Sequence, residues 1–325
     1  MQPLKGLSKL QQRRIARRQT KPQTAVNAVV VSHHGQDLLV ERLDDQQRLR
    51  ARARRTLGRL TTGDWVGIED DGHQHAVIEH LGKRSNLLTR PDAYGKNRPM
   101  AANIDQVIIL LAPTPWMNPE VVERTMIAVF DLPASPIIVL NKTDTLSDLD
   151  ETFTKQIENQ LDEWQQLGFN VYKISAVNGS GLDALKNRLD QRRTLLVGLS
   201  GTGKTTLTRK LTPQAHSAEV RELSGFNQEG VHTTRTSTLY HIPGIDGSII
   251  DAPGVRDFPL SHPRFQAIQK AFPEIVEHAQ WCRFNDCRHV NEPQCAVLAA
   301  VESGKISKRR HALYQEIMQD YKNEY

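Results

Sequence analysis

The sequence predicts an α/β protein with three parts: a small β-barrel, a domain with a mostly parallel sheet, and a helical segment around clustered cysteines. Residues 25–82 contain short apolar stretches separated by turn formers, which is an all-β pattern. From Ile104 onward, buried strands alternate with helical stretches, as expected for repeated βα units. After Asp251 the strand pattern stops, and residues 261–325 have a helical pattern.

Composition and length limit the class of protein. The 325 residues have room for two or three domains, and 38% hydrophobic with 24% charged residues is typical of a globular chain. The longest apolar run, Val107 to Ala112, is too short to span a bilayer, and the N-terminus lacks the apolar core of a secretory signal. We therefore expect a cytoplasmic protein without a membrane partner.

Basic residues are concentrated in two blocks. Residues 1–22 carry seven lysines and arginines and no acid, and residues 48–59 carry six arginines and no acid. Such blocks favour phosphate-rich partners. The candidate RNA-binding residues are Arg13, Arg14, Arg17, Arg18, Arg48, Arg50, Arg52 and Arg54.

The first predicted domain resembles a small barrel of the oligonucleotide-binding (OB) type, because about five short strands fit into some sixty residues. Arginine alternates with leucine and alanine between Arg48 and Arg54, so a strand there would place four guanidiniums on one face. Arginine suits bidentate phosphate contacts and stacking on bases. The alternative is a solvated face that keeps the barrel soluble. Residues 90–103, with two prolines and one glycine, are predicted to be a linker.

The second domain has clear helix signals. Asn118 supplies an N-cap before Pro119 and Glu120, which precede a helix over Val121–Phe130. Gly168 ends a helix over 152–167, and a basic helix is expected over 305–321. The predicted strands are Val107–Leu111, Ile137–Leu140, Val171–Ile174, Thr194–Val197 and Ser248–Ile250.

A phosphate-binding loop is the strongest motif. Gly198 to Thr205 matches G-x-x-x-x-G-K-[ST] between an apolar strand and a helix over Lys204–Leu211. Its backbone N–H groups and the helix N-terminus suit the β-phosphate. Lys204 is expected to bridge the β- and γ-phosphates, and the Thr205 hydroxyl to ligate Mg²⁺. The motif alone leaves ATP and GTP open.

Asn141-Lys142-Thr143-Asp144 favours guanine. The Asp144 carboxylate can accept hydrogen bonds from N1–H and the exocyclic amine of guanine, and adenine would leave it unpaired. Asn141 is expected to orient the loop and approach N7, with Lys142 over the base plane. Ser175-Ala176, after a predicted strand, fits a weaker element whose backbone N–H groups contact guanine O6.

The order of these motifs is unusual. The base-reading tetrapeptide precedes the phosphate loop, and Asp251-Ala252-Pro253-Gly254 follows both, which is the order of a circularly permuted GTPase domain. Asp251 would hold Mg²⁺ through water, and the Gly254 N–H would contact the γ-phosphate. The expected GTP-binding residues are Asn141, Lys142, Asp144, Ser175, Ala176, Gly198, Ser200, Gly201, Thr202, Gly203, Lys204, Thr205, Thr206 and Gly254.

Many GTPases have a water-orienting glutamine directly after the glycine that corresponds to Gly254. This chain has Val255 at that position, so another group must orient the water. Thr233 is the preferred switch threonine for Mg²⁺, with Thr234 as the alternative. His232 is the nearest titratable candidate for orienting the attacking water, and the alternative is a histidine that only packs in the switch. Slow hydrolysis by the free protein is expected, with acceleration when a partner orders the switch.

The three cysteines of the chain lie within fourteen residues, in the pattern Cys282-x₄-Cys287-x-His289-x₅-Cys295. Three thiolates and one imidazole form the donor set of a closed, structural zinc site. Four protein ligands leave no position for a catalytic water. The alternative is three buried cysteines beside an unrelated histidine.

Taken together, these motifs resemble the RsgA (YjeQ/YloQ) family of circularly permuted GTPases. The resemblance implies an OB domain over 25–90 after a basic arm over 1–24, a linker over 91–103, a permuted P-loop GTPase domain over 104–260 and a helical zinc domain over 261–325. It also implies a monomer that uses GTP with Mg²⁺, binds the 30S subunit through 16S rRNA in late maturation, and leaves after hydrolysis stimulated by that subunit. Ala252 and Thr205 depart from the commoner Thr and Ser of the family but keep the functional groups, and Arg235 follows the candidate switch threonines where the family often has another threonine.

Two other functions remain open from the residues alone. A permuted GTPase of large-subunit assembly would share the nucleotide motifs but would not be expected to carry the barrel and the cysteine cluster. A nucleotide-switched RNA-binding module with little catalysis is compatible with Val255. An ATPase or small-molecule kinase is the last alternative.

Overall fold

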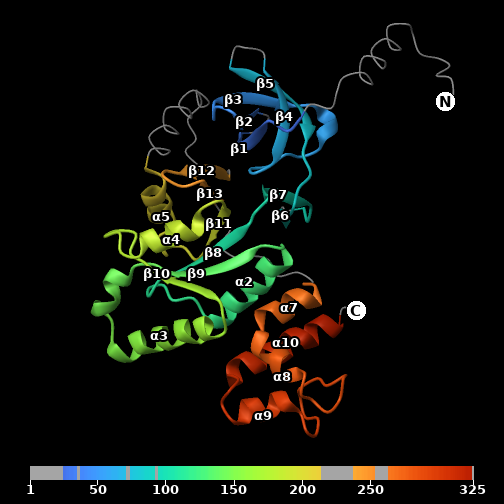
Figure 1. The fold of residues 1–325 in the computed structure, drawn as a ribbon, viewed down its shortest axis with the longest axis vertical. Coiled ribbons are helices and arrows are strands. Elements are labelled where there is room, and N and C mark those ends of the chain that lie inside the picture. The colour runs from blue at the N-terminus through green and yellow to red at the C-terminus, as the bar shows by residue number, and fades with distance from the viewer. Residues whose placement is uncertain are drawn as a thin grey trace, which may run out of the picture. The chain divides into compact units, whose positions relative to one another are not determined.

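The computed structural model describes residues 25–34, 37–70, 74–91, 94–213, 237–252 and 263–323. The chain divides into two compact units, residues 1–84 and residues 85–325. Figure 1 shows a β-barrel in the first unit, and an α/β sheet followed by a bundle of short helices in the second. The predicted fold class is confirmed.

The first unit is a closed five-stranded barrel. Its strand order is β1-β2-β3-β5-β4, and an additional pairing between β1 and β4 closes it. Only β3 and β5 run parallel, and apolar residues such as Val30, Leu49 and Ile78 fill the interior. The bounds are β1 Ala28–His34, β2 Asp37–Arg42, β3 Arg48–Ala53, β4 Trp65–Asp70 and β5 His75–Leu81, with a 3-10 turn at Arg55–Leu57.

The second unit contains a six-stranded sheet of order β10-β9-β8-β11-β13-β12. All neighbours pair in parallel except β12, which is antiparallel to β13. Leucines of α4 and α5 pack with Ile108, Leu110 and Val139 in one core, and α2 packs on β8 and β9. The strands are β8 Gln106–Leu111, β9 Ser135–Leu140, β10 Asn170–Lys173, β11 Arg193–Val197, β12 Thr238–Ile242 and β13 Gly247–Asp251, and the helices are α2 Pro119–Asp131, α3 Glu151–Gln166, α4 Leu182–Leu189 and α5 Lys204–Leu211.

Local signals explain the helix ends. The Asn118 side chain accepts a hydrogen bond from the Glu120 N–H, which caps α2 as predicted. The Asp150 side chain caps α3 by accepting hydrogen bonds from the N–H groups of Thr152 and Phe153. Gly168 follows that helix with φ +86°, a conformation that favours glycine. Helix α5 begins at Lys204 and ends at Leu211, which are the predicted limits.

The predicted linker over 91–103 contains regular structure, and this corrects the expectation. Strand β7 (Asn97–Ala102) pairs with β6 (Leu87–Pro91) in an antiparallel two-stranded sheet. Both strands are edges and the register shifts beside Thr89, so Pro99 is tolerated without loss of a central ladder. The domain limits proposed from the sequence otherwise remain predictions.

The C-terminal helices pack against the α/β domain. Ile127 of α2 lies in the same apolar core as Ile268, Phe272, Val297 and Ile317. The elements are α7 Phe265–Ala271, α8 Pro273–Ala279, α9 Ala296–Glu302 and α10 Lys308–Asn323. This segment therefore shares a core with the sheet domain and is not a separate appendage.

A buried ion-pair network supports the same contact. Glu123 of α2 is fully buried and accepts hydrogen bonds from Trp164 Nε1 at 3.0 Å and from Arg309 at 2.8 and 2.9 Å. Arg310 donates to Glu274 at 2.7 and 3.0 Å, and its Nη1 forms an ion pair with Glu123 Oε1 at 2.8 Å. Burial raises the pKa of Glu123, but the two arginines outweigh it and lower that pKa.

We expect Arg310→Met to destabilise the second unit by about 3–5 kcal/mol, because Glu123 and Glu274 then lose a partner inside the protein. Urea unfolding followed by circular dichroism measures the effect. Lys308→Met, on an exposed residue of the same helix, is the control. Equal stability of the two variants would contradict this interpretation.

Candidate nucleotide site and metal centre

The phosphate loop lies between β11 and α5, in the middle of the sheet. Gly198 and Gly203 have φ of +152° and +93°, which other residues rarely adopt. A Cβ on Gly198 would lie 2.4 Å from the Leu110 carbonyl oxygen, and one on Gly203 would lie 2.4 Å from Asn141 Nδ2. The loop therefore passes its neighbours too closely for side chains.

Lys204 folds back on this loop. Its Nζ donates hydrogen bonds to the carbonyls of Gly198 at 2.6 Å and Leu199 at 2.7 Å. The ammonium group is thus held beside the loop, where phosphate oxygens could replace the carbonyls as acceptors. Buried Thr202 braces the same turn, since its hydroxyl donates to Leu199 O at 3.0 Å. The other predicted loop residues, all exposed, are Ser200, Gly201, Thr205 and Thr206.

Asn141 joins three of the motif loops. Its side chain is only 2% exposed, and its Nδ2 donates to the Thr202 carbonyl at 2.9 Å. Its Oδ1 accepts the Ala176 N–H at 2.9 Å. Both polar ends of the amide are thus occupied by the protein. This geometry supports the predicted orienting role, and the predicted approach to guanine N7 stays a prediction.

Lys142 and Asp144 are more exposed than Asn141. Lys142 has φ +60°, and its Nζ donates to the Thr114 carbonyl at 3.3 Å. Asp144 is exposed at the start of the 3-10 turn Thr143–Asp148, and its carboxylate makes no hydrogen bond with the other described residues. Its carboxylate is therefore accessible to a ligand.

The Ser175-Ala176 element is arranged differently from the prediction. The Ser175 N–H donates to Ser180 O at 3.0 Å, and the Ala176 N–H donates to Asn141. Each of these two N–H groups could donate to guanine O6 only after giving up its present acceptor in the protein. The next residue, Val177, is an exposed apolar side chain whose N–H makes no hydrogen bond with the described residues.

Asp251 is the last residue of β13 and pairs in register with Leu196 of β11. Leu196 lies two residues before Gly198 in the sequence. The carboxylate therefore belongs to the same sheet edge as the phosphate loop. Other predicted site residues lie outside the described residues, and these are Arg13, Arg14, Arg17, Arg18, His232, Thr233 and Gly254.

The predicted cysteine cluster is brought together by the fold. The candidate ligand atoms of Cys282, Cys287, His289 and Cys295 all lie within 4.8 Å of one another. Cys282 Sγ is 3.8 Å from Cys295 Sγ and 3.6 Å from His289 Nδ1, and the latter is 3.4 Å from Cys295 Sγ. This Cys₃His set could bind a metal ion, with Nδ1 as the histidine donor.

Neighbouring groups hold the ligands in place. The Leu298 N–H donates to Cys295 Sγ at 3.4 Å, and the His289 carbonyl accepts from His311 Nε2 at 2.9 Å and Gln315 Nε2 at 2.7 Å. Burial raises the pKa of Cys287 to about 12 in the protein alone. A bound cation would offset the cost of burying the charged thiolate, because a thiol that coordinates a cation is deprotonated.

Glu292 shapes the backbone around His289. Its carboxylate accepts N–H groups of Arg288 at 2.7 Å and Val290 at 2.8 Å, and these hydrogen bonds lower the pKa of Glu292 to about 2. We expect Glu292→Gln to weaken binding of Co²⁺, used as a probe ion for the Cys₃His cluster, about tenfold. The reason is that residues around a metal site orient its ligands. Competition with a coloured chelator measures this, with Glu302→Gln as the exposed control. Unchanged affinity would assign Glu292 no role in the site.

Three of the four candidate RNA-binding arginines of the barrel lie on β3, and three of the four guanidiniums are paired with carboxylates. Arg48, Arg50 and Arg52 alternate with buried Leu49 and Ala51 along β3, while Arg54 follows the strand. Three carboxylates of the barrel itself meet this face. The pairs are Arg48–Glu41 at 3.1 Å, Arg52–Asp37 at 2.8 Å and Arg54–Glu79 at 2.5 Å.

The fold and site together define a circularly permuted P-loop GTPase with an N-terminal barrel and a C-terminal segment whose Cys₃His cluster could bind a metal ion. Comparison with known proteins agrees, because the model of the RsgA GTPase family matches residues 81–261. The chain belongs to this family and is a GTPase. Among the described residues, no helix has the length and apolar character needed to cross a membrane.

Relatives match nearly the whole chain. A protein of Saccharophagus degradans is 37% identical over 297 residues, which cover 90% of this chain and 86% of the relative. One of Ectopseudomonas mendocina is 35% identical over 96% of this chain and 94% of its own. Both bear the name small ribosomal subunit biogenesis GTPase RsgA.

Solved structures show the same architecture. YjeQ from Thermotoga maritima is 26% identical with a TM-score of 0.71, covering 91% of this chain and 98% of its own. YloQ, described as a circularly permuted GTPase, has a TM-score of 0.68 over 92% of this chain and 96% of its own. At 22% identity the second likeness concerns the fold alone.

Proposed function

We propose that this GTPase is an assembly factor of the small ribosomal subunit. It binds the 30S subunit through 16S rRNA late in maturation, hydrolyses GTP slowly alone and faster on the subunit, and leaves after hydrolysis. It acts as a cytoplasmic monomer. The observation that carries the proposal is the end-to-end match, 37% identical over 90% of the chain, to a relative named for small-subunit biogenesis.

The positions of the side chains support the proposed nucleotide roles. Lys204, held at the phosphate loop, would contact the β- and γ-phosphates, and Thr205 at the start of α5 would ligate Mg²⁺ with Asp251 nearby. Exposed Asp144 would bind the guanine edge. Asn141 links the base-reading loop to the phosphate loop and to Ala176 through its side-chain hydrogen bonds. Mg²⁺ supplies charge stabilisation for the transferred phosphoryl group.

The water-activating group is proposed from sequence only. His232 would position the attacking water, Thr233 would complete the Mg²⁺ shell, and Gly254 would contact the γ-phosphate. Loss of subunit-stimulated turnover in His232→Ala, with GTP affinity retained, is the expected result. Unchanged stimulated turnover would assign the water to another group.

The metal at the cysteine cluster is proposed to be one structural zinc ion. Zn–S bonds of about 2.3 Å in a tetrahedron place sulfurs roughly 3.8 Å apart, and Cys282 and Cys295 have this separation, at 3.8 Å. Four protein donors leave no open coordination position. The ion would stabilise the segment and would take no part in hydrolysis.

The barrel arginines are proposed to contact rRNA. Their pairing with Asp37, Glu41 and Glu79 means that phosphate would have to compete with carboxylates already in place. The Arg52–Asp37 pair is solvent-exposed and contributes little, so its exchange is inexpensive. Glu41 and Glu79 are largely buried, so exchange at Arg48 and Arg54 costs more. The arginines of the basic arm, residues 1–24, would add phosphate contacts.

Release after hydrolysis is the part of the proposal that binding measurements address. Cosedimentation of the full chain with purified 30S subunits should be tighter with a non-hydrolysable GTP analogue than with GDP. Equal affinity in the two nucleotide states would refute release by hydrolysis. ATP should fail to displace labelled GTP, and effective displacement would favour an ATPase or kinase.

A further inference from the structure

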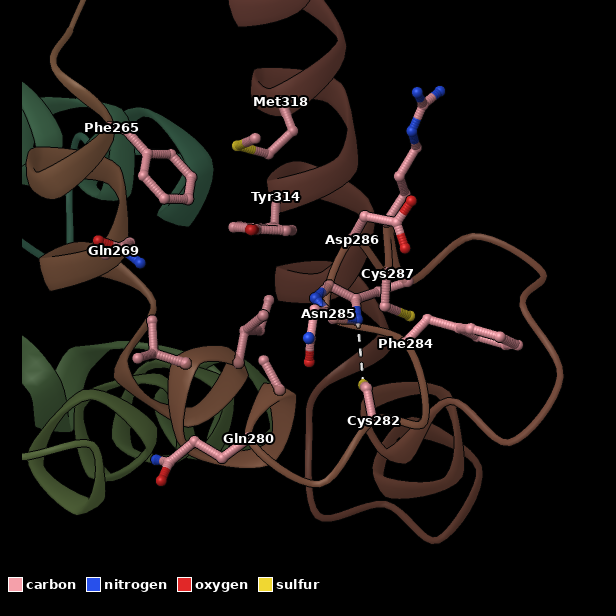
Figure 2. A pocket seen from close by; sticks show the side chains of 15 residues that line it. Phe265, Gln269, Gln280, Cys282, Phe284, Asn285, Asp286, Cys287, Tyr314 and Met318 are labelled. Carbon is pink, nitrogen blue, oxygen red and sulfur yellow. Dashed lines mark hydrogen bonds between the residues drawn. The ribbon is translucent and has the colours of Figure 1, made fainter.

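A cavity of about 520 Å³ adjoins the cysteine cluster and is open to solvent on one side. The cysteine loop forms part of its wall, together with Phe265 of α7 and Tyr314 of α10, as Figure 2 shows. A cavity of this size holds several water molecules, so small solutes can enter it. Three of the four candidate metal ligands line it, and these are Cys282, Cys287 and His289.

The three cysteines of the cluster differ in exposure. Cys282 and Cys287 are half-buried, whereas Cys295 is buried and is not among the residues that line the cavity. The Cys282 Sγ lies 3.8 Å from the Cys295 Sγ. These two sulfurs would have to approach by about 1.8 Å to form a disulfide bond of about 2.05 Å. An accessible thiol therefore lies next to a sheltered thiol that can react with it.

Thiols arranged in this way react with peroxides. A thiolate attacks one oxygen of the peroxide and becomes a sulfenic acid, and a second thiol condenses with the sulfenic acid to give a disulfide. The thiolate is the reactive form, and a thiol that coordinates a cation is deprotonated. The cluster thus combines the reactive form of cysteine with access for a small oxidant.

We propose that the cysteine cluster is a site of reversible oxidation by hydrogen peroxide. The Cys282 thiolate takes one oxygen atom of the peroxide and becomes a sulfenic acid, and the other oxygen is protonated and leaves as water. The Cys295 thiolate then attacks the Cys282 sulfur, the S–S bond forms, and the second oxygen leaves as water after protonation. In total, two thiolates lose two electrons to one peroxide, and with two protons they give one disulfide and two waters.

The cysteine content of the chain restricts the product. The chain has three cysteines, and all of them belong to the cluster. A disulfide within the chain therefore removes two of the four candidate ligands and leaves Cys287 as the remaining thiol. Cys287 and His289 alone do not complete a tetrahedral zinc site, so the oxidised chain no longer retains the ion.

Oxidation also disturbs the fold around the cluster. Cys295 is the N-cap residue of α9, where its Sγ accepts the Leu298 N–H at 3.4 Å, and it packs in one core with Ile127 of α2. Movement of this sulfur toward Cys282 therefore affects the start of α9 and the contact with the α/β domain. The inference rests on the proposed function in one respect, since it makes peroxide a reversible inhibitor of GTP turnover stimulated by 30S subunits.

Zinc release and disulfide formation test the proposal on the free, zinc-loaded chain. Hydrogen peroxide is added, released zinc is followed with a coloured chelator, and the disulfide is mapped by mass spectrometry of peptides with blocked thiols. One zinc ion should leave for each disulfide between Cys282 and Cys295, and a thiol reductant with Zn²⁺ should restore the bound metal. Zinc release without a disulfide, a disulfide that includes Cys287, or zinc retained under peroxide that oxidises free cysteine would each overturn the proposal.

A matched pair of variants tests access through the cavity. Ala279 lines the cavity, and Ala299 is exposed on α9 outside that lining. Ala279→Leu narrows the cavity and should slow zinc release by peroxide several-fold, whereas Ala299→Leu should leave the rate unchanged. Gln280→Trp, on an exposed residue of the same lining, replaces Ala279→Leu if that variant has a lower melting temperature. Equal rates in the two members of the pair would contradict access through the cavity.

Turnover on the ribosomal subunit separates this inference from the proposed function. Peroxide should abolish the stimulation of GTP turnover by 30S subunits, and reduction in the presence of Zn²⁺ should restore it. If 30S subunits do not stimulate the reduced chain, the proposed function fails, while the zinc and disulfide measurements on the free chain still decide the oxidation. If the oxidised chain is stimulated as strongly as the reduced chain, control by peroxide is wrong.

Discussion

Replacing Lys204 by alanine should lower kcat/KM for GTP about 10²–10³-fold, the effect of removing one group that stabilises developing charge in a transition state. The ammonium is held at the phosphate loop by the carbonyls of Gly198 and Leu199, so it needs little reorganisation to reach a phosphate. Single-turnover hydrolysis and GTP affinity, measured separately, divide the loss between chemistry and binding.

Lys210→Ala is the matched control, because Lys210 is an exposed lysine of the same helix. Its turnover should equal that of the parent protein. If the two variants lost activity equally, the loss would reflect damage to α5, and the assignment of Lys204 to the phosphates would be wrong.

Removal of the proposed zinc ion should unfold the C-terminal segment. Structural zinc contributes about 10–16 kcal/mol of apparent binding free energy in small domains. Cys295 is buried in the core that joins α7–α10 to Ile127 of α2, so the loss should spread into the α/β domain. A chelator or His289→Ala should therefore reduce helical circular dichroism and lower the melting temperature of the nucleotide-binding domain.

His241→Ala controls for the loss of a histidine, because His241 is exposed on β12, far in sequence from the cluster. It should leave the metal content and the melting temperature unchanged. A metal-free chain with unchanged melting would show that the ion does not contribute to folding, and the structural role would then have to be abandoned.

Much of the fold was predictable because local signals and burial agree. The strand and helix around the phosphate loop carry uninterrupted apolar and capping patterns, so α5 has the expected limits. The Cys₃His spacing likewise specified which four residues would meet. The hairpin β6–β7 was missed, since its prolines argue against strands and only its edge position tolerates them.

Contacts between distant segments could not be predicted. Nothing in the sequence indicates that Glu123 would be buried between Trp164 and Arg309, because no local pattern records a pairing over 186 residues. The hydrogen bond from the Ala176 N–H to Asn141 Oδ1 could not be predicted either, since it depends on the separation of two strand ends.

GTP turnover with no subunit, with purified 30S subunits and with purified 50S subunits tests the central claim most directly. We expect slow turnover by the free chain, strong stimulation by 30S subunits and none by 50S subunits. Stimulation by 50S subunits alone would assign the protein to large-subunit assembly. Turnover that neither subunit changes would contradict the proposed function.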